Sequence, residues 1–165
     1  MTVAARAARI EDAAAIAAIY NQGIADRIAT FETEPRTPAQ IERWFDGAHP
    51  IVVVENGGAV VAFASTSSYR SRECYAGIAE FSVYVGRNQR GTGAGRVAMT
   101  ALIEAATAAG YWKLLSRVFP ENVASLALMA RMGFRQVGTY QRHGKLDGEW
   151  RDCVIVERLL GSGAA

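Results

Sequence analysis

The chain has 165 residues, half of which are hydrophobic, and its formal net charge at neutral pH is +2. This length suits a single domain with a sizeable core, and so small and interspersed a charge does not indicate a nucleic-acid partner. The longest apolar stretches fall far below the roughly 18 residues of a membrane span, so we expect no membrane partner either.

The apolar patterns predict alternating strands and helices. In chain order they predict a strand over 2–8, a helix over 11–25, a helix beginning at 37, strands over 51–55 and 59–69 joined by a turn, a strand over 80–86, a helix ending at 110, a strand over 112–119, a helix over 122–132, a strand over 134–141, a turn over 145–148 and a strand over 150–160. Asp12 and Thr37 occupy positions suited to helix N-caps, and Pro38 suits a first helical position. The alternation predicts one α/β domain over residues 1–165, with a mixed sheet that is antiparallel at its N-terminal end and a frayed tail over 161–165.

The most informative segment is a Gly-rich turn between the strand over 80–86 and the helix that follows it. It reads Arg90-Gly91-Thr92-Gly93-Ala94-Gly95-Arg96. Unpaired backbone N–H groups at a helix N-terminus can bind phosphate oxygens, and glycine lacks the Cβ atom that would keep an anion away. Arg87, Arg90 and Arg96 add positive charge. The segment therefore predicts a site for a phosphorylated cofactor.

The spacing in this turn argues against two common nucleotide sites. Its glycines follow G-x-G-x-G, whereas a dinucleotide fingerprint needs G-x-G-x-x-G. A triphosphate P-loop needs a lysine, but Lys113 and Lys145 are the only lysines of the chain. What remains is a pyrophosphate held mainly by backbone N–H groups, with no metal required.

No metal site is expected, because the ligand-type residues are scattered. His49 and His143 are far apart, and Cys74 and Cys153 lack C-x-x-C spacing. We interpret the two cysteines as reduced thiols of a cytoplasmic protein, and the first residues do not show the pattern expected of a leader peptide.

The Gly-rich turn resembles the R/Q-x-x-G-x-G/A loop of the GCN5-related N-acetyltransferases (the GNAT superfamily), which holds the pyrophosphate of acetyl-CoA. Residues 120–134 resemble the same family's N-x-x-S…G-F helix, which lines the pantetheine arm. The resemblance runs from about Val3 to Leu160. It implies a GNAT fold, with a mixed and mostly antiparallel sheet of about seven strands, flanked by helices and splayed between the fourth and fifth strands. It also implies that acetyl-CoA lies in the splay against Val83, Val85, Arg90, Gly91, Thr92, Gly93, Ala94, Gly95, Arg96, Asn122 and Ser125.

Acetylation of an amine needs a neutral amine, a polarised thioester carbonyl and a proton for the departing thiolate. Glu80 is the candidate general base, because residues 79–85 resemble the corresponding string of phosphinothricin-type acetyltransferases, where this Glu is the base. The alternative is a solvated residue at a strand end. The resemblance also implies that the backbone N–H of Val85 polarises the thioester. Strand alternation places Glu80, Ser82 and Tyr84 on one face.

Four further segments resemble the phosphinothricin-type subfamily: the Ile-Tyr-Asn string over residues 19–21, and residues 29–38, 69–75 and 144–152. Arginine binds two oxygens of an oxyanion at once, so Arg70 and Arg72 are candidates for the anionic head of an amino-acid substrate, although either is about as well explained as surface charge. The other candidate substrate residues are Phe31, Tyr75, Tyr140 and His143, of which the aromatic ones have core packing as the ordinary alternative.

Met129 departs from the family pattern, which places a Tyr or His there to return a proton to the CoA thiolate. A thioether cannot donate that proton, so water or Ser125 must supply it. Three functions remain open: a small-molecule amino-acid N-acetyltransferase that detoxifies phosphinothricin, methionine sulfoximine or an arsenical analogue; an acetyltransferase for protein N-termini or lysines; and a catalytically weak acyl-CoA sensor. Proteins of this family are often homodimers, and we expect a homodimer here.

Overall fold

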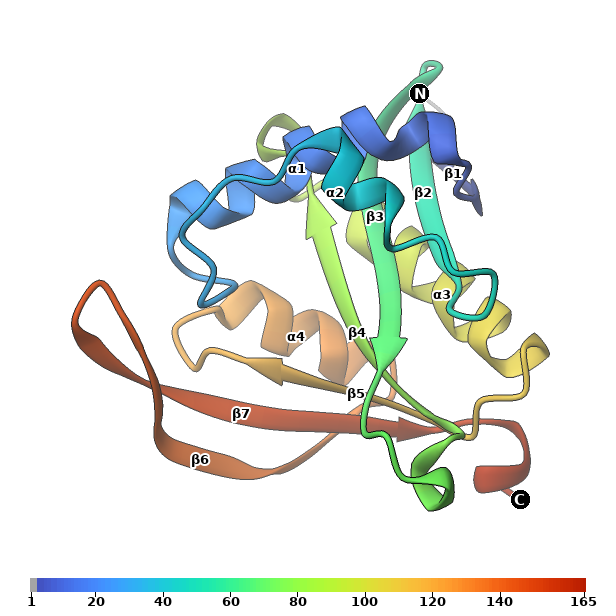
Figure 1. The fold of residues 1–165 in the computed structure, drawn as a ribbon, viewed down its shortest axis with the longest axis vertical. Coiled ribbons are helices and arrows are strands. Elements are labelled where there is room, and N and C mark those ends of the chain that lie inside the picture. The colour runs from blue at the N-terminus through green and yellow to red at the C-terminus, as the bar shows by residue number, and fades with distance from the viewer. Residues whose placement is uncertain (1–2) are drawn as a thin grey trace.

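The computed structural model describes residues 3–165 and contains a seven-stranded sheet in the order β1-β2-β3-β4-β5-β7-β6 (Figure 1). The strands are β1 Val3–Ala7, β2 Ile51–Asn56, β3 Ala59–Ser68, β4 Ile78–Val85, β5 Lys113–Val118, β6 Arg135–Leu146 and β7 Glu149–Leu159. The α-helices of these described residues are α1 Ala13–Asp26, α2 Pro38–Glu42, α3 Ala94–Ala108 and α4 Val123–Arg131. This architecture confirms the mixed α/β fold expected from the sequence.

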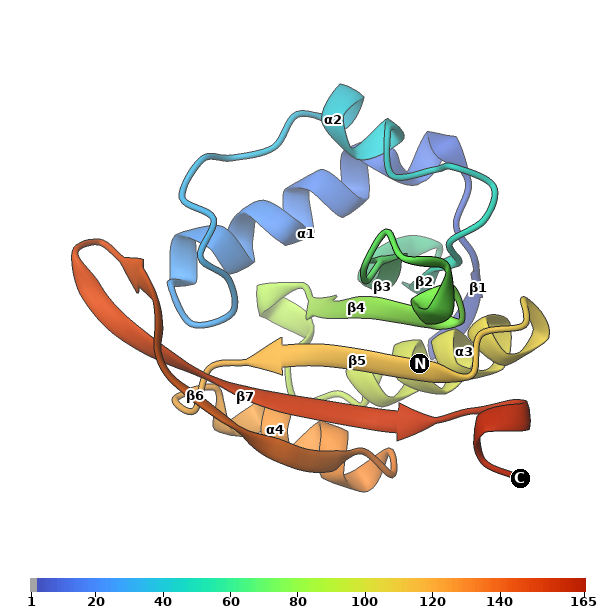
Figure 2. The same ribbon diagram turned by 60° about the horizontal axis from the view of Figure 1, so that its bottom comes forward.

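The helices cover both faces of the sheet, with α1 and α2 on one face and α3 and α4 on the other (Figure 2). On the first face, Ile16 and Ile19 of α1 pack against Phe63 of β3. On the second face, Met99 and Leu102 of α3 are fully buried in the largest core cluster. The odd and even side chains of β4 are therefore directed into two different cores.

The sheet divides between β4 and β5, as the family resemblance implied. These two strands pair in parallel over only three residue pairs, from Ile78 with Lys113 to Glu80 with Leu115. Beyond Glu80, β4 stays paired with β3 while β5 follows β7, so the two strands diverge (Figure 1). The splay opens on the C-terminal half of β4.

The hairpin of β6 and β7 is longer than expected. Strand β6 continues to Leu146 because residues 141–143 form a bulge opposite the single residue Asp152, whose Oδ1 accepts a hydrogen bond from the N–H of Arg142 at 2.7 Å. At the tip, Arg27 Nε lies 2.9 Å from Asp147 Oδ2. This ion pair joins the tip to the end of α1, toward which the hairpin rises in Figure 2.

The two helix starts predicted from capping residues have different outcomes. Thr37 is confirmed as an N-cap, since its hydroxyl accepts from Gln40 N while Gln40 Oε1 accepts from Thr37 N. Asp12 holds the N-cap position of α1, but its side chain accepts no hydrogen bond from an N–H of that helix. Its carboxylate instead binds the guanidinium of Arg6 at 2.8 Å and the backbone N–H of Arg9 at 2.7 Å. An ion pair with β1 thus replaces the expected cap.

The chain end after Leu160 continues as a 3₁₀ turn over Gly161–Gly163, and Leu160 N donates to Trp112 O at 2.8 Å. Fraying of residues 161–165 stays a prediction. Trp112 also covers Gly77, where an added Cβ would clash with the indole ring. The first strand was expected to begin at Thr2, which lies outside the described residues. Among residues 3–165, no helix is long and apolar enough to cross a membrane.

Candidate active site

The backbone of β4 alternates in a way that exposes two of its N–H groups to the splay. The Gly86 N–H donates to β3 at 2.7 Å, whereas the Phe81 carbonyl accepts from Ser116 Oγ of β5 at 2.8 Å. Since successive residues of a strand direct their backbone groups to opposite sides, Val83 and Val85 face the β5 side as Phe81 does. There β5 has already diverged. This geometry favours the roles predicted for the Val83 and Val85 backbone.

The Gly-rich turn leads directly into α3. Gly91 and Gly93 have φ angles of 78° and 88°, a region that glycine enters without steric cost, and Gly93 is the N-cap of α3. The first helical hydrogen bond runs from Val97 N to Gly93 O at 3.1 Å. The N–H groups just before Val97 therefore lie at the unsatisfied start of a helix, where an anion is stabilised.

Gly95 lies where three elements approach one another closely. A Cβ atom at this position would lie 3.2 Å from Leu128 Cδ2 of α4 and 3.4 Å from Val85 Cγ2 of β4. A larger side chain would therefore push α4 and β4 away from the start of α3. The absence of Cβ lets α3 begin close against α4 and β4, beside the backbone that the sequence identified as a pyrophosphate site.

The charge of the turn is smaller than three arginines suggest. Asp26, at the end of α1, binds Arg87 Nη2 with one carboxylate oxygen and Arg90 Nη2 with the other, each at 2.7 Å. Hydrogen bonds from Arg87 and then Arg90 hold the pKa of the Asp26 carboxyl below its ordinary value. Arg96 is exposed. Asp26 therefore partly neutralises the charge of Arg87 and Arg90 and fixes the position of both side chains beside the turn.

A small pocket of about 40 Å³ lies in the splay, between β4, β5 and α4. Its lining includes Ala29, Phe81, Ser82, Val83, Tyr84, Ser116, Arg117, Val118, Asn122, Ser125 and Met129. Asn122 is the N-cap of α4, because its Oδ1 accepts from Ser125 N at 3.2 Å. The cap uses Oδ1 and leaves Nδ2 available to a ligand. The structure thus brings together Val83, Asn122 and Ser125, which the sequence proposed separately.

Met129 lines this pocket but belongs to the core. Its side chain is 2% exposed and packs in the largest hydrophobic cluster. A thioether donates no proton, so the position contributes packing rather than acid catalysis. Ser125, one turn earlier on α4 and partly exposed, is the nearest hydroxyl of the same helix.

Glu80 lies at the point where β4 and β5 separate. Its Oε2 is 3.3 Å from Arg117 Nη2 of β5, and 27% of its side chain is exposed. Glu80 pairs with Ser67 of the neighbouring strand β3, while Arg117 of β5 lines the splay pocket. The carboxylate is therefore near the splay and reachable by solvent, which a general base requires.

A second cleft, of about 420 Å³, lies on the α1 and α2 face of the sheet. It is lined by Tyr20, Arg36, Arg43, Trp44, Asp46, His49, Ser65, Thr66, Ser67, Ser68, Ser82 and Tyr84. Ser82 and Tyr84 also line the splay pocket, so the two cavities lie on either side of one strand, β4. Glu80 lies at the edge of the cleft, between its strand neighbour Ser82 and its cross-strand partner Ser67.

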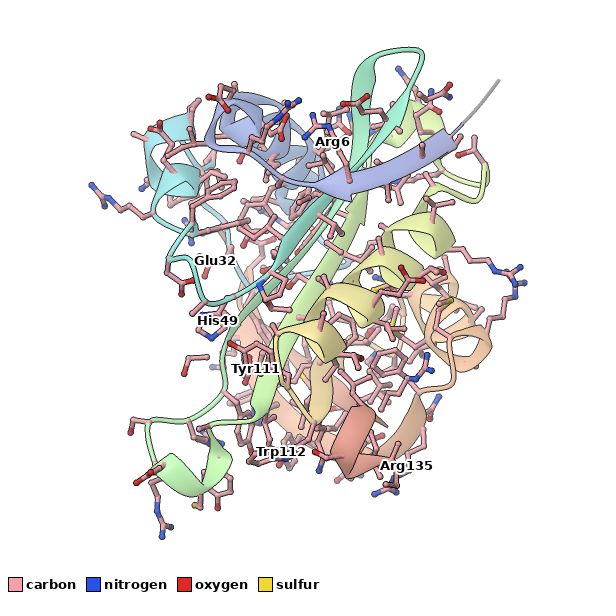
Figure 3. The ribbon with its side chains drawn as sticks, turned by 90° about the vertical axis from the view of Figure 1, so that its right-hand side faces the viewer. Arg6, Glu32, His49, Tyr111, Trp112 and Arg135 are labelled. Atoms are coloured by element: carbon pink, nitrogen blue, oxygen red, sulfur yellow. The ribbon has the colours of Figure 1, made fainter. Side chains whose placement is uncertain are left out.

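Hydrogen bonds fix the ionised groups of this cleft. Burial alone would raise the pKa of Asp46, but hydrogen bonds from the His49 N–H, the His49 ring and the Ala48 N–H lower it to about 2. The His49 ring stacks on Tyr111, with centroids 5.8 Å apart, and Figure 3 shows the two side by side. Burial raises the pKa of Tyr84, so its hydroxyl stays neutral.

The predicted substrate arginines lie outside both cavities. Arg70 and Arg72 are exposed on the connection between β3 and β4, where Arg70 stacks over Tyr69 at 4.9 Å and Arg72 lies 5.9 Å from the Tyr75 ring. A role for Arg70, Arg72 and Tyr75 in substrate binding stays a prediction.

The other predicted substrate residues occupy the β6–β7 hairpin and its contact with the loop before α2. Phe31 packs edge-on against Phe119 with centroids 4.8 Å apart and covers Gly144, where a Cβ would lie 2.7 Å from its ring. Tyr140 and His143 stack on each other at 4.6 Å at the bulge of β6, both exposed. Phe31 thus packs the hairpin against the domain, whereas Tyr140 and His143 face solvent.

Sequence reasoning missed most of the second cleft. Arg36 lies within residues 29–38, which resemble the subfamily, but neither Arg36 nor Arg43, Trp44 or His49 was identified as a site residue. Asn21 is the signal that was available, because its Oδ1 accepts from Arg36 N at 2.8 Å and its Nδ2 donates to Arg36 O at 3.0 Å. The Asn of the Ile-Tyr-Asn string on α1 thereby ties Arg36 to the cleft.

Neither metal ligands nor a disulfide shape the site. In the range 3–165, no three His, Cys, Asp or Glu side chains are grouped to hold a metal ion. Cys74 is an exposed free thiol, and Cys153 is a buried free thiol whose pKa is raised by burial.

Comparisons with known proteins agree on one family. The chain matches the acetyltransferase (GNAT) family over residues 16–134. It is 33% identical over 165 residues to the L-methionine sulfoximine/L-methionine sulfone acetyltransferase of Pseudomonas paraeruginosa, covering 97% of this chain and 96% of that protein. It is 32% identical over 157 residues to the phosphinothricin N-acetyltransferase of Streptomyces coelicolor, covering 91% and 92% of the two chains. The crystal structure of a phosphinothricin acetyltransferase from Sinorhizobium meliloti in complex with acetyl-CoA has a TM-score of 0.91 at 30% identity, covering 99% of this chain and 91% of that one.

Proposed function

The chain belongs to the acetyltransferase (GNAT) family, and we propose that it transfers the acetyl group of acetyl-CoA to the α-amino group of a small amino acid or a toxic analogue. Phosphinothricin and methionine sulfoximine are the acceptors named by its relatives. Acetylation abolishes the charge of the amino group, so the expected role is resistance to such compounds.

The residues around the splay fit acetyl-CoA. The N–H groups that begin α3 suit its diphosphate, and the missing Cβ of Gly95 lets this helix start lie close to α4 and to Val85 of β4. The backbone of Val83 and Val85 faces the gap in which the pantetheine arm would lie, and Asn122 Nδ2 is available to it. Acetyl-CoA supplies the activated acyl group as a thioester.

The acceptor amine would enter from the second cleft. The observation that carries this proposal is that Ser82 and Tyr84 line both cavities, so an amine beside Ser82 is separated from the splay by the edge of one strand. Glu80 lies on the same face of β4 and at the edge of the same cleft. It is therefore placed to accept a proton from an ammonium group there, directly or through one water.

The proposed reaction is a direct transfer. Glu80 takes a proton from the ammonium group, the neutral nitrogen attacks the thioester carbonyl, the new C–N bond forms and the C–S bond breaks. The Val85 N–H would stabilise the oxyanion that develops on that carbonyl. The thiolate then takes a proton from water or from the Ser125 hydroxyl, because Met129 cannot supply one. The second proton, which the nitrogen loses when it becomes an amide, restores that donor.

A thiol-release assay with acetyl-CoA and a panel of acceptors tests the proposal. Turnover of free phosphinothricin or methionine sulfoximine supports it, turnover of peptides alone selects a protein acetyltransferase, and turnover of neither selects an acyl-CoA sensor. Glu80→Gln should lower kcat by about 100-fold or more at neutral pH and recover part of it at high pH, where the free amine needs no base. Near-normal turnover of Glu80→Gln at both pH values would exclude the general-base role.

We further propose that the protein acts as a homodimer in the cytoplasm. The edge strand β6 and its partner β7 expose apolar side chains, among them Val137, Tyr140 and Trp150, which suits an interface between two copies. The free thiols of Cys74 and Cys153 agree with a reducing compartment. Light scattering in solution tests the dimer, and a mass of about one chain at working concentration would contradict it.

A further inference from the structure

The second cleft contains more positive than negative charge. Its charged lining residues are Arg36, Arg43 and Asp46, together with the ionisable His49. Asp46 is engaged by the His49 ring and by two backbone N–H groups. The Asp46 carboxylate is therefore occupied by hydrogen bonds within residues 46–49. The guanidinium groups of Arg36 and Arg43 remain to make the electrostatic potential of the cleft positive.

The two arginines differ in how far they are engaged. Arg36 Nη2 lies 2.8 Å from Glu32 Oε2, and its side chain is 25% exposed. Arg43 is exposed at the end of α2, and within residues 3–165 it forms no ion pair. Figure 3 shows Glu32 on the same side of the molecule as His49. Arg43 is the cation of the cleft with the most capacity to bind an incoming anion, and Arg36 is the second.

The rest of the lining suits a small polar molecule. Strands β3 and β4 contribute three serines to the lining, Ser65, Ser67 and Ser82. Trp44, which follows Arg43 in the sequence, contributes an aromatic ring. The volume of about 420 Å³ lies in the range of about 300–1,000 Å³ that small-molecule sites occupy. Hydroxyl groups, aromatic rings and guanidinium groups are the groups that orient a charged amino acid.

We propose that Arg43, assisted by Arg36, binds an oxyanion of the acceptor and so makes the enzyme selective for amines that carry a carboxylate or phosphinate group. A guanidinium donates two parallel hydrogen bonds to such a group and repels an ammonium. It would therefore direct the oxyanion toward α2 and leave the amino group at the Ser82 and Glu80 side. This inference rests on the proposed function, because it assigns the acceptor to the second cleft.

Kinetics of Arg43→Gln test the inference. With acetyl-CoA saturating, KM for phosphinothricin and for methionine sulfoximine should rise about 10- to 100-fold, the loss expected for a hydrogen bond to a charged group, while KM for acetyl-CoA changes less than twofold. The α-amide of methionine sulfoximine lacks a carboxylate and should react equally with wild type and variant. Arg131→Gln is the matched control, since Arg131 is exposed in the last turn of α4 and lines neither cavity.

The two amino acids distinguish which oxyanion is bound. If Arg43 holds the α-carboxylate, both acceptors lose affinity alike; if it holds the distal group, phosphinothricin loses far more. Either result supports the inference. An unchanged KM for both acceptors, or an equal loss for the amide, would overturn it.

Calorimetry separates this inference from the proposed function. In the presence of CoA, wild type should bind phosphinothricin and Arg43→Gln should bind it at least tenfold more weakly, with thermal melting confirming that the variant is folded. If phosphinothricin binding depends on Arg43 but the protein acetylates no amino acid, the proposed function is refuted and oxyanion binding by Arg43 is supported. If neither turnover nor binding changes in Arg43→Gln, the role of Arg43 is refuted and the proposed function stands.

Discussion

Glu80 and Arg117 face each other across the last parallel pair of β4 and β5, with Glu80 Oε2 3.3 Å from Arg117 Nη2. The side chains are 27% and 49% exposed, so the pair adds little to stability. Its effect is instead on position, because Arg117 holds the carboxylate beside the splay. We expect Arg117→Gln to lower kcat about tenfold with an unchanged KM for acetyl-CoA, and Arg117→Lys to retain most activity.

A double-mutant cycle decides whether Arg117 acts through Glu80. If it does, Arg117→Gln should cost nothing further in an enzyme that already carries Glu80→Gln. Additive losses in kcat would show that Arg117 acts on the reaction independently and would contradict the positioning role.

Gly95 offers a test of the close packing beside the Gly-rich turn. Gly95→Val should raise KM for acetyl-CoA tenfold or more, because the side chain would meet Leu128 and Val85. Gly138→Val on β6 is the control, since a Cβ there meets nothing within 4 Å. Equal KM values for acetyl-CoA in the two variants would contradict a close approach at Gly95.

Met129 should behave as a packing residue. Met129→Leu conserves volume, and we expect its kcat to remain within about twofold of wild type. Met129→Ala should lower the free energy of unfolding in urea by about 2–5 kcal/mol, because it leaves a cavity at a position that is 2% exposed. A tenfold fall in kcat for the leucine variant, without loss of stability, would give Met129 a chemical role.

Asp46 should contribute stability that acid removes. Its pKa in the folded protein is about 2, below the ordinary value of 3.8, so its contribution is fully present above about pH 4 and disappears as the pH falls toward 2. Because the side chain is 45% exposed, solvent screening limits this contribution to about 1 kcal/mol. Asp46→Asn should unfold at lower urea concentration at pH 6, and the difference from wild type should vanish near pH 2. A constant difference across that range would contradict the linkage.

The cofactor half of the site was predictable because it depends on local sequence. Gly91, Gly93 and Gly95 specify a turn at a helix start, and Asn122 is both a helix N-cap and a pocket residue. Such features are set by backbone conformation and spacing within a few residues. The splay followed only from the family resemblance, since periodicity does not report where β4 and β5 stop pairing.

The acceptor half was poorly predictable because it is assembled from distant segments. Arg43 follows a helix that ends at Glu42, and it joins Ser82 only through the packing of α2 over β3. Long-range contacts of this kind leave no spacing to read. Asp12 shows a local difference instead, since it holds the predicted N-cap position of α1 while its carboxylate binds Arg6, six residues earlier.

Binding of acetyl-CoA is the most direct test of the central claim, because every proposed step begins with the coenzyme in the splay. A crystal structure of the protein with acetyl-CoA should place the diphosphate against the N–H groups between Gly91 and Arg96, with the thioester between β4 and β5 near Val85. Failure to bind acetyl-CoA in calorimetry, or a diphosphate seated away from that turn, would contradict it.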